Sequence, residues 1–442
     1  MSDIIAKTQR LSTTESSEDS QSFMSADTSI GSDEYIEDIL WFEWNDDQAL
    51  RDHLSRHGTR NIASLLDDSL EAWKRKSVNI AVIGQSGKGK SSLINALRGL
   101  TEADKDAAAV GEQETTRKCT PYSHPKYNNI MYWDIPGCSK ETFEKKKYLQ
   151  QINYRYYDYF LIVSSERFLE ADIWLAKELM EKGKRDRCYF IRSKVDIDMA
   201  SRRRRAMLQN EIFDERQAFQ DFQVVVKADM FKALGDSTPF QLFLLSSHFP
   251  NRYEFQNLQV KLVVDALAEK RFSLAFGMNS LAQPLLDYKR RVLSDRRKKV
   301  ALQACSCMPE TPSGLKIVST RLPSINAELE FYKEQLSLDD TGLNTVACRA
   351  GVTVQDLRRT VELNAPVLSD SEISNILLEK YRYYLEKEGK KPLGKTKLFF
   401  TGQQKIAFKA ISKFLDEQMN TYIKDTDKLI DYVKTTTENN TV

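Results

Sequence analysis

A glycine-rich stretch after a short apolar run is the feature that most constrains this chain. Residues 78–83 (VNIAVI) are apolar and of strand length, residues 84–91 read GQSGKGKS, and residues 92–97 begin a helical pattern. Glycine lets the backbone turn so that successive N–H groups face one anion, and a helix N-terminus adds positive potential there. The stretch therefore predicts a strand, a phosphate-binding loop and a helix in direct succession.

The residue types in this loop predict how a nucleotide and its metal ion are held. Lys90 is expected to reach the β- and γ-phosphates, and the Ser91 hydroxyl is expected to ligate Mg²⁺. A glycine-rich turn that binds nothing is the alternative, and the agreement of strand, loop and helix argues against it. The expected phosphate-contact residues are Gly84, Gln85, Ser86, Gly87, Lys88, Gly89, Lys90, Ser91 and Ser92.

A second motif, Asp134-Ile135-Pro136-Gly137, follows another apolar run at residues 129–133. Asp134 is expected to hold Mg²⁺ through water, and the Gly137 N–H is expected to face the γ-phosphate. Such a motif is weak evidence alone. About 50 residues after a phosphate-binding loop and at the end of a strand, it strongly favours a nucleotide switch.

Two features bear on hydrolysis. Thr115 or Thr116, in the preceding polar segment, is expected to close onto Mg²⁺ when the γ-phosphate is present, with Thr116 assigned as the metal ligand. An ordinary polar loop is the alternative for both threonines. Cys138 stands directly after Gly137, where Ras-like switches carry a glutamine that orients water, and a thiol cannot do the same. Hydrolysis is therefore expected to be slow, absent, or helped by a partner.

The sequence Ser193-Lys194-Val195-Asp196 stands where GTPases carry [NT]-K-x-D. The Asp196 carboxylate can accept hydrogen bonds from the ring N–H and the exocyclic amine of guanine, which adenine cannot offer. Lys194 would lay its aliphatic stem along the base. Ser246 and Ser247, after the last apolar run, are expected to support it. These residues predict that guanine nucleotides are preferred over adenine nucleotides.

Patterning along the chain predicts the domains. Residues 77–265 alternate strand-length apolar runs with helical patterns, which indicates an α/β domain with a mostly parallel sheet. Residues 266–442 lack strand patterns and read as all-α, with a capping box at Ser369–Glu372. Residues 35–76 read as two helices that join this helical domain, and the acidic, Ser/Thr-rich residues 1–34 as a disordered tail.

Composition limits the remaining functions. Basic and acidic residues nearly balance, 65 against 63, so the net charge of +2 does not favour nucleic acid as a partner. No apolar run approaches the ~18 residues of a membrane span, so a cytoplasmic location with at most peripheral membrane contact is expected. The basic segment Lys289–Lys299 is the candidate surface for that contact, and a solvated helix face is its alternative. An RNA-associated GTPase, with Arg202–Arg205 and the cluster at 289–299 as its footprint, is a weaker alternative.

Together, these motifs are similar to those of the immunity-related GTPases, an interferon-inducible family akin to dynamins. The chain carries GQSGKGKS at 84–91, ETTRKCTPY at 114–122, DIPG at 134–137 and SKVDID at 193–198, and its helical end also resembles the family. Lys90 matches the lysine-bearing branch of that family. The resemblance implies a Ras-like P-loop G domain with a mostly parallel sheet, plus an all-α domain formed from both chain ends.

The resemblance also implies function. It implies binding of GTP, GDP and Mg²⁺, with Glu114 as the candidate catalytic acid beside Lys90 and Thr116. It implies GTP-dependent dimers or oligomers, with itself or with related GTPases, and a role in innate defence at intracellular membranes. Two function classes stay open: a GTPase whose nucleotide state controls assembly, and a GTP-loaded scaffold with negligible hydrolysis. Turnover that rises with protein concentration distinguishes the first from the second.

Overall fold

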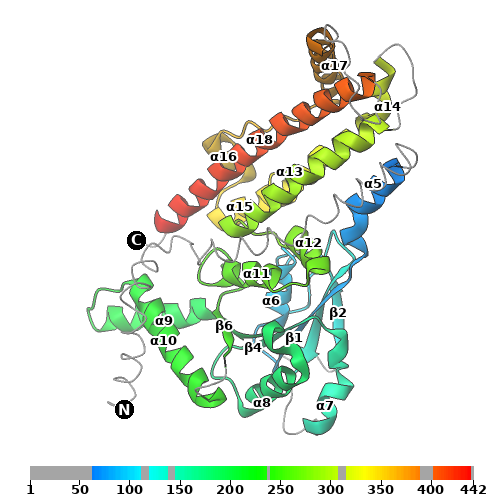
Figure 1. Ribbon diagram of the computed structural model, residues 1–442. Helices are drawn as coiled ribbons and strands as arrows, with labels where there is room; N and C mark the ends of the chain where they lie inside the picture. The colour runs from blue at the N-terminus through cyan, green and yellow to red at the C-terminus, as the bar shows by residue number, and fades with distance from the viewer. Residues whose placement is uncertain are drawn as a thin grey trace, which may run out of the picture. The chain divides into compact units, whose positions relative to one another are not determined.

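The computed structural model describes residues 62–110, 119–137, 145–235, 239–306, 315–388 and 402–439. The described residues form two compact units (Figure 1). Residues 76–285 belong to the first unit, and residues 62–75 and 286–439 belong to the second. The expected N-terminal tail and the first expected helix lie outside the described residues.

A six-stranded sheet forms the centre of the first unit (Figure 1). Its strand order is β2-β3-β1-β4-β5-β6, and β2 alone runs antiparallel to its neighbour. Strands β1, β4 and β5 are buried along their whole length, as expected for parallel strands of a sheet that is covered on both faces. The strands are β1 (Val78–Gly84), β2 (Thr120–Ser123), β3 (Ile130–Pro136), β4 (Tyr159–Ser164), β5 (Cys188–Arg192) and β6 (Gln241–Leu244).

Helices pack on both faces of this sheet. On one face α6 and α12 pack against β1 and β3, and α11 packs against β6. On the other face, side chains such as Ile83 of β1 share a core with Leu175, Met199 and Phe222 from three helices. The helices are α6 (Lys90–Leu97), α7 (Lys145–Gln151), α8 (Glu170–Leu179), α9 (Val195–Leu208), α10 (Glu215–Leu234), α11 (Phe255–Val264) and α12 (Ala268–Gly277), with short turns at Tyr154–Tyr156, Met180–Lys184 and Arg185–Arg187.

The strand register brings several loops to one edge of the sheet. Gly84 at the end of β1 lies opposite Pro136 of β3, and Ser164 at the end of β4 lies opposite Arg192 of β5. Because these strands are parallel, the loops that follow them all begin along the edge formed by their carboxyl ends. In open α/β sheets this is the edge where ligands bind.

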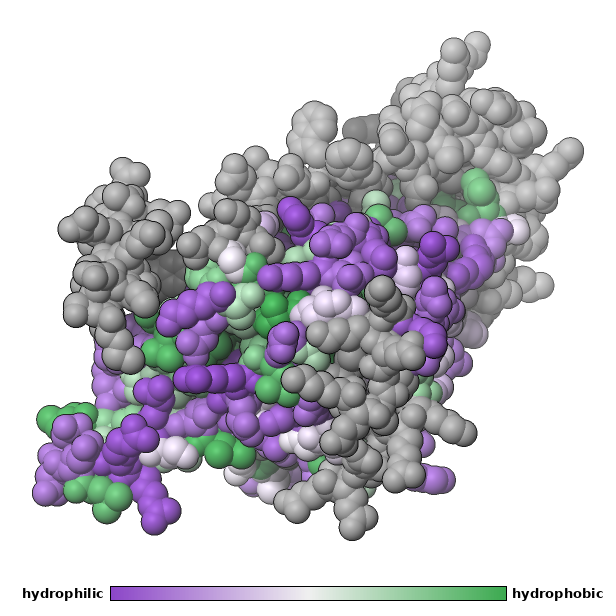
Figure 2. Space-filling model, turned by 90° about the horizontal axis from the view of Figure 1, so that it is seen from below, coloured by the Kyte–Doolittle hydropathy of each residue, from purple (hydrophilic) through white to green (hydrophobic). Residues whose placement is uncertain are grey.

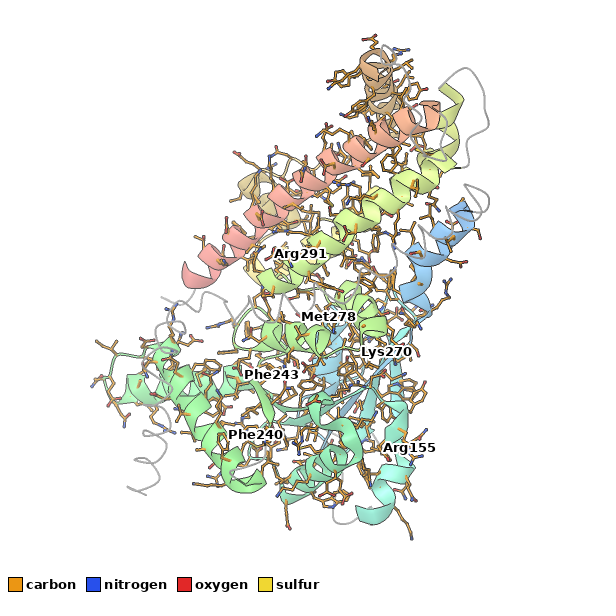
Figure 3. All side chains as sticks on the ribbon, viewed as in Figure 1. Arg155, Phe240, Phe243, Lys270, Met278 and Arg291 are labelled. Atoms are coloured by element: carbon orange, nitrogen blue, oxygen red, sulfur yellow. The ribbon has the colours of Figure 1, made fainter. Side chains whose placement is uncertain are left out.

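The first unit extends to Leu285, which is further than the boundary expected at residue 265. Lys270 of α12, labelled in Figure 3, donates from Nζ to Asp158 at 2.7 Å. Gly277 lies so close to β3 that an added Cβ would be 2.3 Å from Cδ1 of Ile130. Residues 268–277 are helical without strand patterning, so their sequence resembles the helical domain, whereas their contacts hold them against the sheet.

The second unit is entirely helical in its described residues. Its long helix α18 (Gly402–Asn439) packs against α14, α15, α16 and α17. Arg296 of α13 donates to the Leu70 carbonyl of α5 at 2.7 Å, which joins the two ends of the chain. The remaining elements are α5 (Ile62–Glu71), a 3₁₀ turn at Ala72–Arg75, α13 (Gln283–Ser306), α14 (Leu315–Gln335), α15 (Asp340–Ala350), α16 (Val354–Val361) and α17 (Asp370–Glu388). The predicted fold class is confirmed.

The basic segment Lys289–Lys299 does not present the cluster of exposed cations that its sequence suggested. Lys289 is only 2% exposed, although its charge predicted a solvent-facing side chain. Most of these cations find partners inside the second unit: the Gln335 carbonyl for Lys289, Asp427 for Arg290, Glu328 for Arg296, Asp416 for Arg297 and Ser69 for Lys299. These tertiary contacts argue against the expectation that this segment is a surface for membrane contact. Within the part of the chain that the structure describes, no helix has the length and apolarity to cross a membrane.

Candidate nucleotide-binding site

The loop between β1 and α6 turns at positions that require glycine. At Gly84 an added Cβ would lie 2.3 Å from the carbonyl oxygen of Val163 in β4. Gly87 and Gly89 have φ values of 73° and 88°, in the left-handed region that other residues avoid. The Leu93 N–H then donates to the Gly89 carbonyl at 2.9 Å and begins α6. The loop therefore leads directly into the positive end of a helix.

Three polar side chains meet beside this loop. Lys90 Nζ donates to the Gln85 carbonyl at 3.2 Å and lies 3.7 Å from Oδ1 of Asp134. Ser91 Oγ donates to Oδ2 of the same carboxylate at 3.1 Å. Burial lowers the pKa of Lys90, while Asp134 favours its charged form. Strand pairing sets this arrangement, because Asp134 of β3 lies opposite Val82, two residues before the loop.

The donor set fits Mg²⁺ together with a polyphosphate. Mg²⁺ is bound by hard oxygen ligands, usually one or two from the protein with substrate phosphates and water. The Ser91 hydroxyl and the Asp134 carboxylate supply such oxygens side by side, 3.1 Å apart. The ammonium of Lys90, which is only 5% exposed, supplies positive charge next to the same loop.

Gly137 of the second motif lies against the phosphate loop. Its N–H donates to the Gly84 carbonyl at 3.0 Å. An added Cβ at Gly137 would lie 2.8 Å from the carbonyl carbon of Gly84, so glycine is required for this approach. The β3 motif and the phosphate loop are thus in direct backbone contact. Cys138, the next residue, lies outside the described residues.

The residues after β5 are tied to the phosphate loop from the other side. Ser193 is buried, and its Oγ donates to the Lys88 carbonyl at 2.6 Å. Lys194 has a left-handed φ of 59°, and its Nζ donates to the Gly87 carbonyl at 2.8 Å. The motif that was expected to recognise a base therefore sits beside the loop that was expected to recognise its phosphates.

Asp196 lies in the first turn of α9 with one unused acceptor. Its Oδ1 is buried and accepts no hydrogen bond from the residues that the structure describes. A buried acceptor without a donor is costly, so this carboxylate suits a ligand that brings N–H groups. Nearby, the Ser246 hydroxyl accepts from the Phe249 N–H at 3.3 Å, and Ser247 is half-buried.

The remaining predicted residues divide into two groups. Ser92, at the start of α6, turns its hydroxyl towards Glu102 at 3.4 Å, and Ser86 is exposed in the loop. The predicted catalytic and switch residues Glu114, Thr115 and Thr116 lie outside the described residues, and their roles stay predictions.

The sequence analysis missed the contribution of the loop after β4. Glu166 accepts a hydrogen bond from Lys88 Nζ at 2.9 Å, and this partner lowers the pKa of Glu166. The buried Ser164 accepts from the Glu166 N–H at 3.3 Å, and its carbonyl accepts from the Ser193 N–H at 2.9 Å. The available signal was position alone: these residues follow the third apolar run, at the edge where the other motifs also lie.

The chain is similar in sequence to several known proteins. The family model described as Interferon-inducible GTPase (IIGP) matches residues 48–424. T-cell-specific guanine nucleotide triphosphate-binding protein 2 of Mus musculus is 30% identical, over 76% of this chain and 78% of that protein. Interferon-inducible GTPase 5 of Rattus norvegicus is 32% identical, over 71% and 66%.

A solved structure is also similar. It belongs to an oligomerised bacterial dynamin pair, is 11% identical, and covers 92% of this chain and 77% of that chain with a TM-score of 0.33. A likeness at that score supports no statement about function.

Proposed function

The chain belongs to the interferon-inducible GTPase family and is a GTPase, and from this premise we propose how its own residues bind and hydrolyse GTP. The phosphates would lie on the loop between β1 and α6, and the base would lie at the start of α9. One observation carries the proposal: Lys90, Ser91 and Asp134 meet beside a glycine loop at the start of a helix.

The phosphate side of the site supplies charge. Lys90 would exchange its contact with the Gln85 carbonyl for phosphate oxygens, which are stronger acceptors for an ammonium group. Ser91 and Asp134 would hold Mg²⁺, and the ion when bound neutralises the charge that develops on the phosphates. The Gly137 N–H, now bonded to Gly84, would turn to the γ-phosphate, which is possible because no side chain hinders it.

The base side of the site supplies selectivity. The buried Oδ1 of Asp196 would accept an N–H of guanine, and an adenine base would leave it without a donor. The bond from Lys194 Nζ to the Gly87 carbonyl couples this contact to the phosphate loop. Base recognition and phosphate binding would therefore both depend on the conformation of this loop.

Self-association is the second part of the proposal. Cys138 replaces the glutamine that orients water in Ras-like switches, so one isolated site lacks that group. Glu114 would orient the attacking water or accept its proton once assembly positions it, and Thr116 would supply a hydroxyl oxygen to Mg²⁺. Attack of the water oxygen on the γ-phosphorus breaks the bond to the bridging oxygen and yields GDP and phosphate.

Turnover measured against protein concentration tests this mechanism. We expect specific activity to rise with concentration, because general acid–base groups contribute about 10²–10⁴-fold only when they are positioned. Glu114→Ala should abolish that rise while GTP affinity stays within a few-fold, and Glu112→Ala, two residues away, should behave as the wild type. A constant specific activity across concentrations would instead favour the second candidate, a GTP-loaded scaffold, which the residue Cys138 also suits.

We also propose a setting for this cycle. The family is described as interferon-inducible, which supports a role in cell-autonomous innate defence. The partners would be further copies of this chain and related GTPases. The protein would act in the cytoplasm and contact intracellular membranes peripherally. Support for such contact comes from a surface of the first unit, the turn between α9 and α10.

A further inference from the structure

The turn between α9 and α10 exposes aliphatic side chains to an unusual degree. Met207 is 66% exposed, Leu208 78% and Ile212 99%. All three lie within residues 207–212, here called the α9–α10 tip, which Figure 2 shows as green side chains among purple ones at its left edge. Aliphatic side chains that gather in water, rather than occurring singly, usually mark a surface that contacts a partner or a membrane.

Cationic side chains flank these aliphatic ones. Arg204 and Arg205 end α9 just before the tip, and Arg216 follows it in α10; all three are exposed. Within the described ranges of the chain these arginines form no ion pair. Three acidic residues are close in sequence. Glu211 is exposed in the tip, Asp214 caps α10 by accepting from the Gln217 N–H at 3.1 Å, and Glu215 pairs with Arg203 at 2.9 Å. The three exposed arginines therefore outnumber the carboxylates of Glu211 and Asp214, which leaves one net positive charge around the aliphatic cluster.

The tip projects from a braced base. The Glu211 N–H donates to the Ala206 carbonyl at 2.9 Å and closes α9. Behind it, Glu215 accepts from Arg203 at 2.9 Å and from the Tyr253 hydroxyl at 3.2 Å. The Arg203 guanidinium also lies 5.4 Å from the ring centre of Phe213. Polar and aromatic groups thus face inwards while the aliphatic ones face outwards, so the exposure does not result from a loose turn.

We propose that the α9–α10 tip docks on an anionic lipid bilayer. Met207, Leu208 and Ile212 would enter between the headgroups, and the arginines would bind phosphate or carboxylate groups at the surface. Apolar side chains beside basic ones, at low overall hydrophobicity, are what interfacial membrane binding requires. This inference rests on the proposed peripheral association and names the surface that performs it.

Other occupants fit the tip less well. Single-stranded RNA is bound by stacking on aromatic side chains, and the exposed groups here are aliphatic. A stable protein interface needs about 800 Å² per partner and usually aromatic anchors, more than a six-residue turn offers. The basic segment of α13 is not a competing membrane surface, because most of its cations are paired inside the second unit.

Vesicle flotation of the full-length chain tests the proposal. The vesicles contain phosphatidylcholine alone or mixed with phosphatidylserine. We expect the wild type to float with the mixed vesicles, and Leu208→Ser/Ile212→Ser to lower its partition constant by about tenfold or more. Arg204→Ala/Arg205→Ala should lower partition to a similar extent and weaken its salt dependence. The matched control is Val224→Ser/Val225→Ser, which removes two half-exposed aliphatic side chains from α10 and should change partition less than twofold.

The possible failures are distinguishable. A wild type that floats with neither vesicle would rule out both peripheral membrane association and the tip as its docking surface. Equal flotation of the wild type and both tip variants would rule out only the tip as the docking surface. If the serine variant lowers the mass measured by light scattering but not flotation, the occupant is a second copy. If the arginine variant lowers RNA affinity and no variant changes any other measured property, the occupant is RNA. GTP affinity, measured on every variant, should stay unchanged and so reports folding.

Discussion

Lys90 combines burial with charge, and this combination is informative at the scale of one residue. An ammonium group that is 5% exposed loses hydration, and its nearest compensation is one carbonyl at 3.2 Å and one carboxylate at 3.7 Å. Burial lowers the pKa of Lys90 for the same reason. A phosphate chain would relieve that cost, so the residue is prepared for an anion.

Lys90→Ala should weaken GTP binding by about ten- to a hundredfold, because hydrogen bonds to charged groups contribute roughly 1.5–3 kcal/mol each. Isothermal titration calorimetry measures the change. Lys182→Ala is the control, since Lys182 lies in the turn Met180–Lys184, pairs with Glu178 at 3.8 Å and is not among the expected phosphate contacts. Equal losses in both variants would contradict the assignment of Lys90.

Asp196→Asn should change the base preference. The asparagine amide donates a hydrogen bond, so it can pair with the 2-oxo group of xanthine where the carboxylate accepted from guanine. Competition between GTP and XTP should therefore shift towards XTP by about tenfold or more. Asp198→Asn serves as control, because Asp198 is the partner of Arg192 at 2.7 Å. A variant that still prefers GTP to the same degree would rule out base recognition by Asp196.

At the scale of elements, one buried ion pair connects α13 with α14. Arg296 Nε donates to both carboxylate oxygens of Glu328, at 2.8 and 3.0 Å, and the guanidinium lies 4.6 Å from the ring centre of Phe331. Glu328 itself is only 4% exposed. The pair links two long helices that are also joined by the bond from Lys289 to the Gln335 carbonyl at 3.3 Å, and its burial makes the loss of one charge costly.

Glu328→Gln should destabilise the second unit by about 3–5 kcal/mol, because it leaves a buried cation without its counter-charge. Chemical unfolding followed by helical circular dichroism measures this loss. Glu330→Gln, two residues along the same helix, is the control: its carboxylate is 68% exposed and its pair with Lys333 should contribute about 0–1 kcal/mol. Similar effects of the two substitutions would show that burial of the pair does not matter.

At the scale of the whole molecule, the two units have separate cores and should respond separately to heat. GDP at a hundred times its Kd should stabilise the first unit by about 2.7 kcal/mol. Phe414→Ala, which empties a fully buried position on α18, should destabilise the second unit by about 3–5 kcal/mol. Scanning calorimetry should therefore show each change in a different transition. One transition that both changes shift together would mean that the units unfold as one.

Local chemistry was sufficient for much of the fold and the site. A loop of glycines between an apolar run and a helical run specifies its own backbone, as the left-handed Gly87 and Gly89 show. The capping box at Ser369 likewise forms from neighbours, with the Ser369 N–H donating to Glu372 at 2.7 Å. Strands β1 and β3 begin within one residue of the apolar runs at 78–83 and 129–133 that predicted them. Such features depend on interactions a few residues apart, which is why patterns in the sequence reveal them.

Features that depend on contacts between residues far apart in the sequence could be seen only in the tertiary structure. The edge strand β2 is four residues long and contains Pro121, so it has little pattern of its own and exists through pairing with β3. Glu166 joins the site through Lys88, and α12 joins the sheet through Asp158, each across more than 70 residues. The cations of α13 suggested an exposed surface from the sequence, whereas most of them have partners inside the second unit. A side chain's charge is known from the sequence, but its partner and its exposure depend on which segments pack around it.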